Sequence, residues 1–387
     1  MTRTTDNLWL NRYAVLTAAA TLVLICFGGL VTSHGAGMAV PDWPNTFGYN
    51  LFFFPISKWV GGIFYEHTHR LVASAVGLLT TILALWLWLK ESRRWLRWLG
   101  VAAFLAVVLQ GVLGGLRVVL FKDEIGIFHA ALGQLFFVWT CAIALFTSRW
   151  WRCAPALRSP VADRGGFRRL YLVTTLLIFG QLLLGATMRH QHAGLAIPDF
   201  PAAYGRLWPA LDADSVARYN QQRVEVSAAN PITAAQIVLQ MAHRVAALAI
   251  LALVAWVAWR PHPRLQGRHP LVKMSRAWAA LVLVQFFLGA ATIWTGKSAD
   301  IATAHVAVGA LSLMTGAMLV IIGWRCLVPA ETGKAVAAGA WTQPGSTTIN
   351  APARPGPFPG GESETCPANS MSGSSGSRFD LASGLRG

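Results

Sequence analysis

Long apolar segments separated by short polar connections dominate this chain. The apolar segments run for about 20 residues, the length that a helix needs to cross a bilayer. They are continuously apolar and do not alternate with polar positions, which favours helices over a membrane barrel. The pattern predicts an all-α integral membrane protein with eight transmembrane helices, at residues 13–32, 68–89, 98–118, 127–147, 170–187, 236–259, 274–294 and 302–324.

A motif recurs in the connections that follow the first and the fifth apolar segments. Residues 37–44 read GMAVPDWP and residues 194–201 read GLAIPDFP. Further along, Gln110 and Gly114 correspond to Gln285 and Gly289, and the register is kept between the two halves. Helix composition cannot dictate a loop motif of this kind, so we interpret it as an internal repeat. Each copy holds an even number of spans, which predicts two parallel four-helix bundles related by an axis along the membrane normal.

The predicted organisation follows from these segments and from the composition of the ends. After residue 326 the chain becomes rich in Gly, Pro, Ser and Ala, which is typical of disorder. We expect a cytoplasmic N-terminus at 1–12, an N-terminal four-helix unit at 13–150, a cytoplasmic linker at 151–169, a C-terminal four-helix unit at 170–326 and a disordered cytoplasmic tail at 327–387.

Composition and charge support a membrane location. Hydrophobic residues make up 55% of the chain and charged residues only 12%, about half the charged share of a soluble domain. The net charge of +16 therefore indicates topology and not a nucleic-acid partner: fifteen Lys and Arg lie in the even-numbered connections and seven in the odd-numbered ones. This bias predicts a multi-pass protein of the inner (plasma) membrane with both termini cytoplasmic. The first span is too long for a cleaved signal peptide and is expected to stay as an anchor.

The cysteines exclude some kinds of site. None of the five lies in the two long connections predicted to face outward, and none forms a CxxC or CxxCH motif. An external disulfide framework, a thiolate metal site and covalent haem attachment are therefore not expected.

Four histidines begin the even-numbered spans and so share one depth in the membrane: His69, His129, His243 and His305. A single histidine in a membrane helix is most often a polar residue with a local partner. Here, however, each predicted bundle offers two imidazoles from two helices, and such a pair can clamp a flat macrocycle by its iron. Zinc is the alternative, but two histidines without cysteine leave a tetrahedral site incomplete, even if Glu66 adds a third ligand in the first unit.

Charged residues flank the first histidine of each unit. Residues 66–70 read EHTHR and residues 240–244 read QMAHR. Glu66 lies three residues before His69, so both project from one side of a helix. A carboxylate there can accept a proton or stabilise developing positive charge, whereas the alternative is an acid favoured by the helix dipole. Arg70 and Arg244 can each pair with a haem propionate or act as topological or headgroup-facing charges.

Over roughly residues 13–324 the chain resembles the haem A synthases, because it combines eight spans, the Glu66 to Arg70 motif, the Pro-Asp-Trp-Pro loop and single histidines on the later even-numbered spans. The resemblance implies oxidation of the haem O ring methyl to a formyl group, which gives the haem A of terminal oxidases. It assigns haem b to His243 and His305, substrate haem O to His69 and His129, and turnover to Glu66.

Some members of that family carry cysteine pairs in the outer loops, which this chain lacks. The resemblance also raises haem O synthase and terminal oxidase assembly factors as candidate partners, besides the lipid bilayer. The residues alone leave two other functions open: a dihaem b electron carrier, and a haem-binding insertion factor without chemistry.

Overall fold

Long helices make up most of the structure, a computed structural model that describes residues 7–154, 161–163, 165–222, 231–260, 265 and 269–328. Within these residues, eight helices are long and apolar enough to cross a membrane. They are α1 (Leu8–Ser33), α2 (Gly61–Lys90), α3 (Arg94–Val119), α4 (Asp123–Thr147), α7 (Phe167–His190), α9 (Ala234–Trp259), α10 (Pro270–Trp294) and α11 (Ala299–Cys326). The predicted all-α membrane fold is confirmed, and each predicted span lies inside one of these helices.

The helices begin earlier than the apolar segments do. The clearest case is α2, which starts at Gly61 although the apolar segment was predicted to start at residue 68. Hydropathy ends the segment at the polar residues Glu66 and His67, but both side chains are buried, with 4% and 1% of their surface exposed. Buried polar groups with partners can continue a helix beyond its apolar part.

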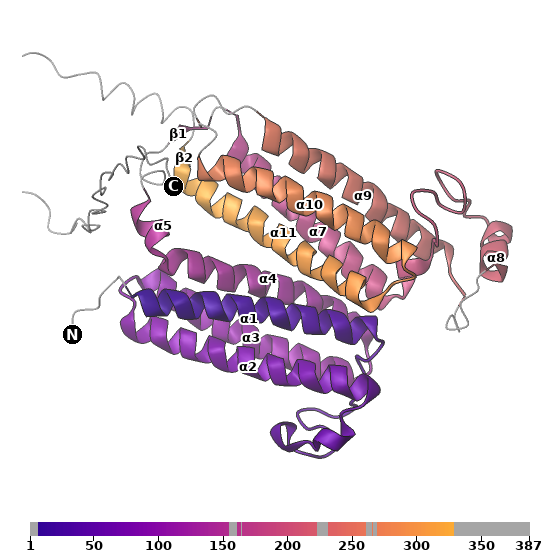
Figure 1. The fold of residues 1–387 in the computed structure, drawn as a ribbon, viewed down its shortest axis with the longest axis horizontal. Helices are drawn as coiled ribbons and strands as arrows, with labels where there is room; N and C mark the ends of the chain where they lie inside the picture. Colours follow the sequence, from indigo (N-terminus) through magenta and orange to yellow (C-terminus); the bar gives the residue numbers. More distant parts are fainter. Residues whose placement is uncertain are drawn as a thin grey trace, which may run out of the picture. The chain divides into compact units, whose positions relative to one another are not determined.

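The helices pack into two rings of four (Figure 1). Helices α1 to α4 each contact the next, and α4 closes the ring on α1; α7, α9, α10 and α11 contact one another in the same way. The first ring buries Leu83, Leu87 and Ile143, and the second buries Trp278 and Leu319. The rings join because α11 also packs against α1 and α4, and α4 packs against α7.

Large apolar side chains cover the outward faces of the helices. Leu78, Leu85, Leu105, Leu176 and Leu248 are each more than half exposed. Apolar surface in water costs about 25 cal/mol per Å², so faces of this kind suit hydrocarbon and not water. The chain is a multi-pass membrane protein.

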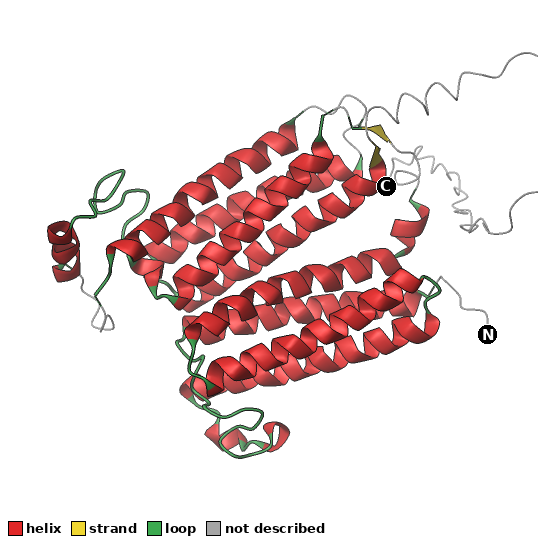
Figure 2. Cartoon of the chain, turned by 180° about the vertical axis from the view of Figure 1, so that it is seen from behind, coloured by secondary structure: helices red, strands yellow, loops and turns green. Residues whose placement is uncertain are grey.

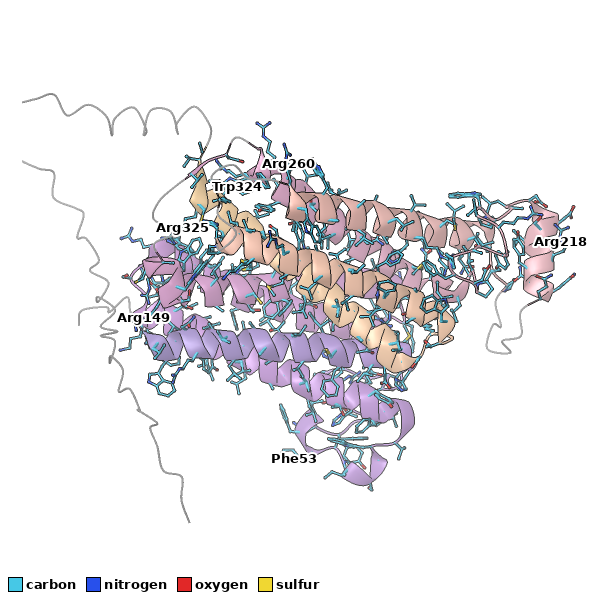
Figure 3. The ribbon with its side chains drawn as sticks, turned by 45° about the horizontal axis from the view of Figure 1, so that its top comes forward. Phe53, Arg149, Arg218, Arg260, Trp324 and Arg325 are labelled. Carbon is cyan, nitrogen blue, oxygen red and sulfur yellow. The ribbon has the colours of Figure 1, made fainter. Side chains whose placement is uncertain are left out.

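The long loops and the short connections lie at opposite ends of the helices (Figure 2). At one end, the 3₁₀ turns η1 (Leu51–Phe53), η2 (Ile56–Lys58) and η3 (Ala193–Leu195) and the helix α8 (Ala213–Gln221) belong to the loops after α1 and α7. Figure 3 shows Arg218 on α8 at this end, with Arg149, Arg260 and Arg325 at the other.

Three short elements at the arginine-rich end were not predicted. Helix α5 (Arg149–Cys153) follows α4, and strand β1 (Val161–Ala162) pairs in parallel with β2 (Leu327–Val328), with Val161 opposite Leu327. The pairing ties the linker between the units to the end of α11. It also places the first two residues of the predicted 327–387 tail in a strand; the rest of that predicted tail lies outside the described residues.

Candidate functional site

The four histidines lie at matching positions on four helices. His69 is on α2, His129 on α4, His243 on α9 and His305 on α11, each within the first three turns of its helix. All four therefore lie toward the end of the helices that carries the long loops, which we call the histidine end. Within each ring, the two imidazoles are close enough for the charge of one to act on the other. The structure thus brings together the pairs that the sequence suggested.

A glycine on the preceding helix makes room for each imidazole. A Cβ atom at Gly28 would lie 3.3 Å from His69 Cε1, a distance tighter than nearly all real contacts. The same relation recurs in the other three cases, at 3.1 to 3.3 Å, for the pairs Gly114 with His129, Gly185 with His243 and Gly289 with His305. The sequence analysis marked Gly114 and Gly289 only as repeat positions and missed Gly28 and Gly185, although these two glycines are separated by the same 157 positions as the Pro-Asp motifs.

Each of the four imidazoles carries a buried nitrogen without a partner. The Nδ1 atoms of all four histidines are buried and accept or donate no hydrogen bond among the described residues. Glutamines on neighbouring helices bond instead to the backbone, since Gln110 donates to the carbonyl of His129 (3.0 Å) and Gln181 to that of His243 (2.8 Å). Buried polar groups in native proteins are paired with protein, water or ligand, so four matched exceptions indicate a bound group.

The donor set fits haem better than zinc. Within the described residues, no group of three or more His, Cys, Asp or Glu side chains is placed to hold a metal ion. A tetrahedral zinc site needs at least three such ligands, and Glu66 does not supply a third one. Haem iron needs only one or two axial imidazoles, which each ring provides.

Glu66 anchors the loop between α1 and α2. Its Oε2 accepts the backbone N–H of Val40 at 2.8 Å, and its Oε1 accepts Arg70 Nη2 at 2.7 Å. The rest of the Arg70 guanidinium is also engaged, donating to the carbonyls of Val40, Asp42 and Asn45 at 2.7 to 2.9 Å. This carboxylate and guanidinium therefore hold the loop against the start of α2, three residues before His69.

Gln240 and Arg244 hold the second long loop in the same manner. Gln240 Oε1 accepts the N–H of Ile197 at 2.6 Å, and its amide group donates to the carbonyls of Gly194 and Ile197. Arg244 donates to the carbonyls of Ile197, Asp199 and Ala202 at 2.8 to 3.4 Å. Ile197, Asp199 and Ala202 occupy the positions in the second loop that Val40, Asp42 and Asn45 occupy in the first. Glu66 and Arg70 bind the backbone groups of those three residues in the first loop.

These contacts give Arg70 and Arg244 partners that the sequence did not suggest. Both guanidinium groups were interpreted as partners of propionates or as topological charges, yet both point into a loop and bond to carbonyl oxygens. The role was not visible from the sequence because the acceptors are backbone atoms about 25 to 47 residues away.

The two loops share a second anchor in the aspartate of the motif. Asp42 accepts the backbone N–H groups of Phe47 (2.7 Å) and Gly48 (2.8 Å), and Asp199 accepts those of Tyr204 and Gly205 at the same distances. Burial of the Asp42 carboxyl opposes its ionisation, but the two N–H groups and the charge of Arg70 lower its pKa below the usual value. The motif therefore encodes the fold of the loop.

His67 also serves the loop and not the histidine pair. Its ring lies 4.9 Å from both Phe54 and Trp59, centroid to centroid, and its Nδ1 is 3.1 Å from Thr46 Oγ1. His34 stacks on Tyr65 at 3.9 Å. Both imidazole rings therefore pack against aromatic residues at the histidine end. Of the histidines in this part of the chain, only His69 corresponds in position to His129, His243 and His305.

Comparison with known proteins assigns the chain to a family. The family model for cytochrome oxidase assembly proteins (COX15-CtaA) matches residues 11–317. The match begins within α1, ends within α11 and includes all four histidines. The chain belongs to this family. Its membership accounts for the resemblance seen in the sequence and implies an involvement of haem.

Relatives of the COX15-CtaA chain match it over most of their length. A Halalkalibacterium halodurans protein is 25% identical over 81% of this chain and 96% of its own. Proteins of Geobacillus kaustophilus (76% and 86%) and Bacillus cereus strain AH187 (84% and 96%) are each 27% identical. All three are named "Heme A synthase". The similarity is distant and extends across both helix rings.

Proposed function

We propose that this protein is a haem A synthase, which oxidises the ring methyl of haem O to a formyl group. The observation that carries the proposal is the difference between two otherwise matched sites. Each ring holds a pair of imidazoles with unpartnered Nδ1 atoms, but the residue that anchors the loop before the first of these histidines is the carboxylate of Glu66 in the first ring and the amide of Gln240 in the second.

In this proposal the two rings divide the work. His243 and His305 would hold haem b in the second ring, and His69 and His129 would hold haem O in the first. Haem b supplies one-electron redox chemistry when it is bound. The glycines beside the histidines set the position of each imidazole. The buried apolar interior of each helix ring excludes water from the macrocycle.

Glu66 is the residue that we assign to the chemistry. Its carboxylate is buried and lies one helical turn from His69, where it can accept a proton or stabilise developing positive charge. Arg70 and the N–H of Val40 fix its orientation. A preorganised carboxylate of this kind needs no rearrangement during the reaction.

The proposed location is the plasma membrane with the histidine end outward and both termini in the cytoplasm. It rests on the excess of Lys and Arg at the opposite end, where Arg149, Arg260 and Arg325 lie (Figure 3). Haem O synthase and terminal oxidase assembly factors are the proposed partners, because the substrate must be delivered and the product passed on within the bilayer.

The test is the pigment that the protein carries and makes. The full chain is purified from cells that also make haem O, and the extracted haems are separated by chromatography. Haem A in these cells, and haem O or A beside haem b on the protein, supports the synthase. Haem b alone, with no haem A formed, would identify a dihaem electron carrier, and a chain that retains haem O unchanged would identify an insertion factor.

A further inference from the structure

Two partly buried arginines lie at the junction between the rings, near the histidine end. Arg117 is in the last turn of α3, and Arg189 is next to the last residue of α7. Asp123 Oδ1 connects the two helix ends, because it lies 3.2 Å from Arg117 Nη2 and 3.9 Å from Nδ1 of His190, the residue after Arg189. Neither arginine anchors a Pro-Asp loop. In the other half of the chain, the residue that corresponds to Arg117 is Thr292 and the residue that corresponds to Arg189 is Thr32, so neither charge is repeated.

Arg117 lies near the histidine pair of the first ring. It follows Gly114, which packs against His129, by one helical turn, and its guanidinium lies against Gly37, where a Cβ atom would be only 2.8 Å away. Asp123 is bonded to it at 3.2 Å, but that carboxylate is 44% exposed while the Arg117 side chain is 15% exposed. The buried Nε of Arg117 has no partner among the described residues.

Arg189 lies near the second pair and also bonds to the first ring. It follows Gly185, which packs against His243, by one helical turn, and its Nη2 donates to the Gly29 carbonyl (2.6 Å) and to Ser33 Oγ (2.5 Å) on α1. Next to this contact the rings approach closely, since a Cβ atom at Gly29 would lie 3.1 Å from Thr303 on α11. The buried Nε of Arg189 also lacks a partner in the described part of the chain.

A guanidinium withdrawn from water without an anion is costly, and removing its counter-charge leaves a larger penalty than the pair itself is worth. The junction holds two such groups, each with an unpaired buried donor, and the one carboxylate bonded to them, Asp123, is partly in water. Haem carries two propionates on one edge of the macrocycle, and a carboxylate is the anion that a guanidinium fork binds best.

We propose that Arg117 and Arg189 form a shared propionate site at the junction, in which Arg189 binds a propionate of haem b and Arg117 a propionate of the substrate haem. The inference rests on the proposed function. It adds two residues between the rings to Arg70 and Arg244, whose Nη donors hold the loops, although the buried Nε of Arg244 also has no partner among the described residues. It also joins the two haems electrostatically, because each macrocycle then contributes negative charge to one cluster.

The test separates the charge of Arg189 from its contact with α1. The variants are Arg189→Gln, which removes the charge, Arg189→Lys, which keeps it, and the matched control Ser33→Ala, which removes one α1 bond only. Haem b loss is followed by transfer to apomyoglobin, and the midpoint potential of haem b by spectroelectrochemistry. A charge-assisted hydrogen bond contributes enough that its loss should speed transfer by about tenfold or more.

We expect Arg189→Gln to lose haem b about tenfold faster and to have a lower midpoint potential, since removing a positive charge favours the oxidised haem. Ser33→Ala should match the wild type and Arg189→Lys should lie near it. Equal changes in all three variants would mean that the contact between the rings matters and not the charge, which overturns the inference. So would an Arg189→Gln variant that behaves as the wild type.

A second measurement addresses the propionate directly. Protein made under haem limitation is loaded in detergent with iron protoporphyrin IX or with its dimethyl ester, which has no free carboxylates. The wild type should bind the free acid more tightly, and Arg189→Gln should reduce that preference by about tenfold. An unchanged preference would overturn the assignment to Arg189. A wild type that binds neither compound would instead refute the haem sites of the proposed function.

Discussion

Glu66 and Gln240 accept the same kind of hydrogen bond in the two rings, each from the backbone N–H that precedes a Pro-Asp pair. The distances are 2.8 Å to Val40 and 2.6 Å to Ile197. The side chain at this position is therefore an anchor for the loop in both rings, and a carboxylate is not required for that purpose. The charge of Glu66 is what distinguishes the first ring.

Replacing Glu66 by Gln should abolish activity without disturbing the loop. An amide can accept the Val40 N–H as Gln240 accepts that of Ile197, so we expect near-normal yield and haem b content. The loss of charge and basicity should lower the rate by about 10²-fold or more, and haem O should accumulate. The measurement is chromatography of haems extracted from cells that express each variant.

Two controls separate anchoring from chemistry in that experiment. Glu66→Leu leaves the buried Val40 N–H without an acceptor, which costs about 1–3 kcal/mol, so this variant should lose both activity and protein yield. Gln240→Leu should lose yield in the same way through Ile197. Normal haem A levels in the Glu66→Gln strain would contradict a catalytic role and leave the loop anchor as the only function of this carboxylate.

The sequence predicted the architecture well because hydropathy sets the spans directly. It also predicted that the four histidines would share one depth, and each lies within the first three turns of its helix; their role as haem ligands stays a prediction. The roles of Arg70 and Arg244 could not be read in this way. Their acceptors are loop carbonyls, which every residue has, so no side-chain pattern marks them. Arg117 and Arg189 were missed for another reason: they lie at the ends of helices from different rings, and only the folded chain brings Asp123, the partner of Arg117, within 3.9 Å of His190.

Replacing His243 or His305 by Ala should remove haem b. Each substitution deletes one of the two imidazoles of the second ring, and these lie close enough to act on each other. His69→Ala is the matched control, because it makes the same change in the first ring and should leave haem b in place while substrate haem is lost. Reduced-minus-oxidised spectra and pyridine haemochromogen assays give the haem content. Undiminished haem b in purified His243→Ala protein would remove this residue as a ligand.

Cysteine labelling should show the histidine end outside the cytoplasm. Asn45 lies in the exposed first loop, Ala217 is exposed on α8, and Ser92 is exposed at the opposite end. In a background without the five native cysteines, Asn45→Cys and Ala217→Cys should react with an impermeant maleimide in intact cells, and Ser92→Cys only after lysis. The reverse pattern would invert the proposed topology. The loop residue Ser227, a further outward prediction, lies outside the described residues.

The glycines beside the imidazoles give a test of whether histidine position limits haem binding. A Cβ atom at Gly185 would lie 3.3 Å from His243 Cε1, and one at Gly289 would lie 3.1 Å from His305 Cε1. Gly180 is on the same helix as Gly185, but nothing described lies within 4 Å of a Cβ there. Gly180→Ala is therefore a control for a new Cβ atom on the same helix at a position where no neighbour is displaced.

We expect Gly289→Val to displace the His305 ring and lower haem b content severalfold, and Gly185→Val to act in the same way through His243. Overpacking of this kind costs about 1–3 kcal/mol when the neighbours cannot move, whereas Gly180→Ala should keep full haem and gain slightly in stability, because Ala favours a helix by about 1 kcal/mol over Gly. Haem per protein and thermal unfolding in detergent are measured together. If Gly289→Val kept full haem b at unchanged stability, the imidazole would have room to move, and the glycines would not be what positions the ligands.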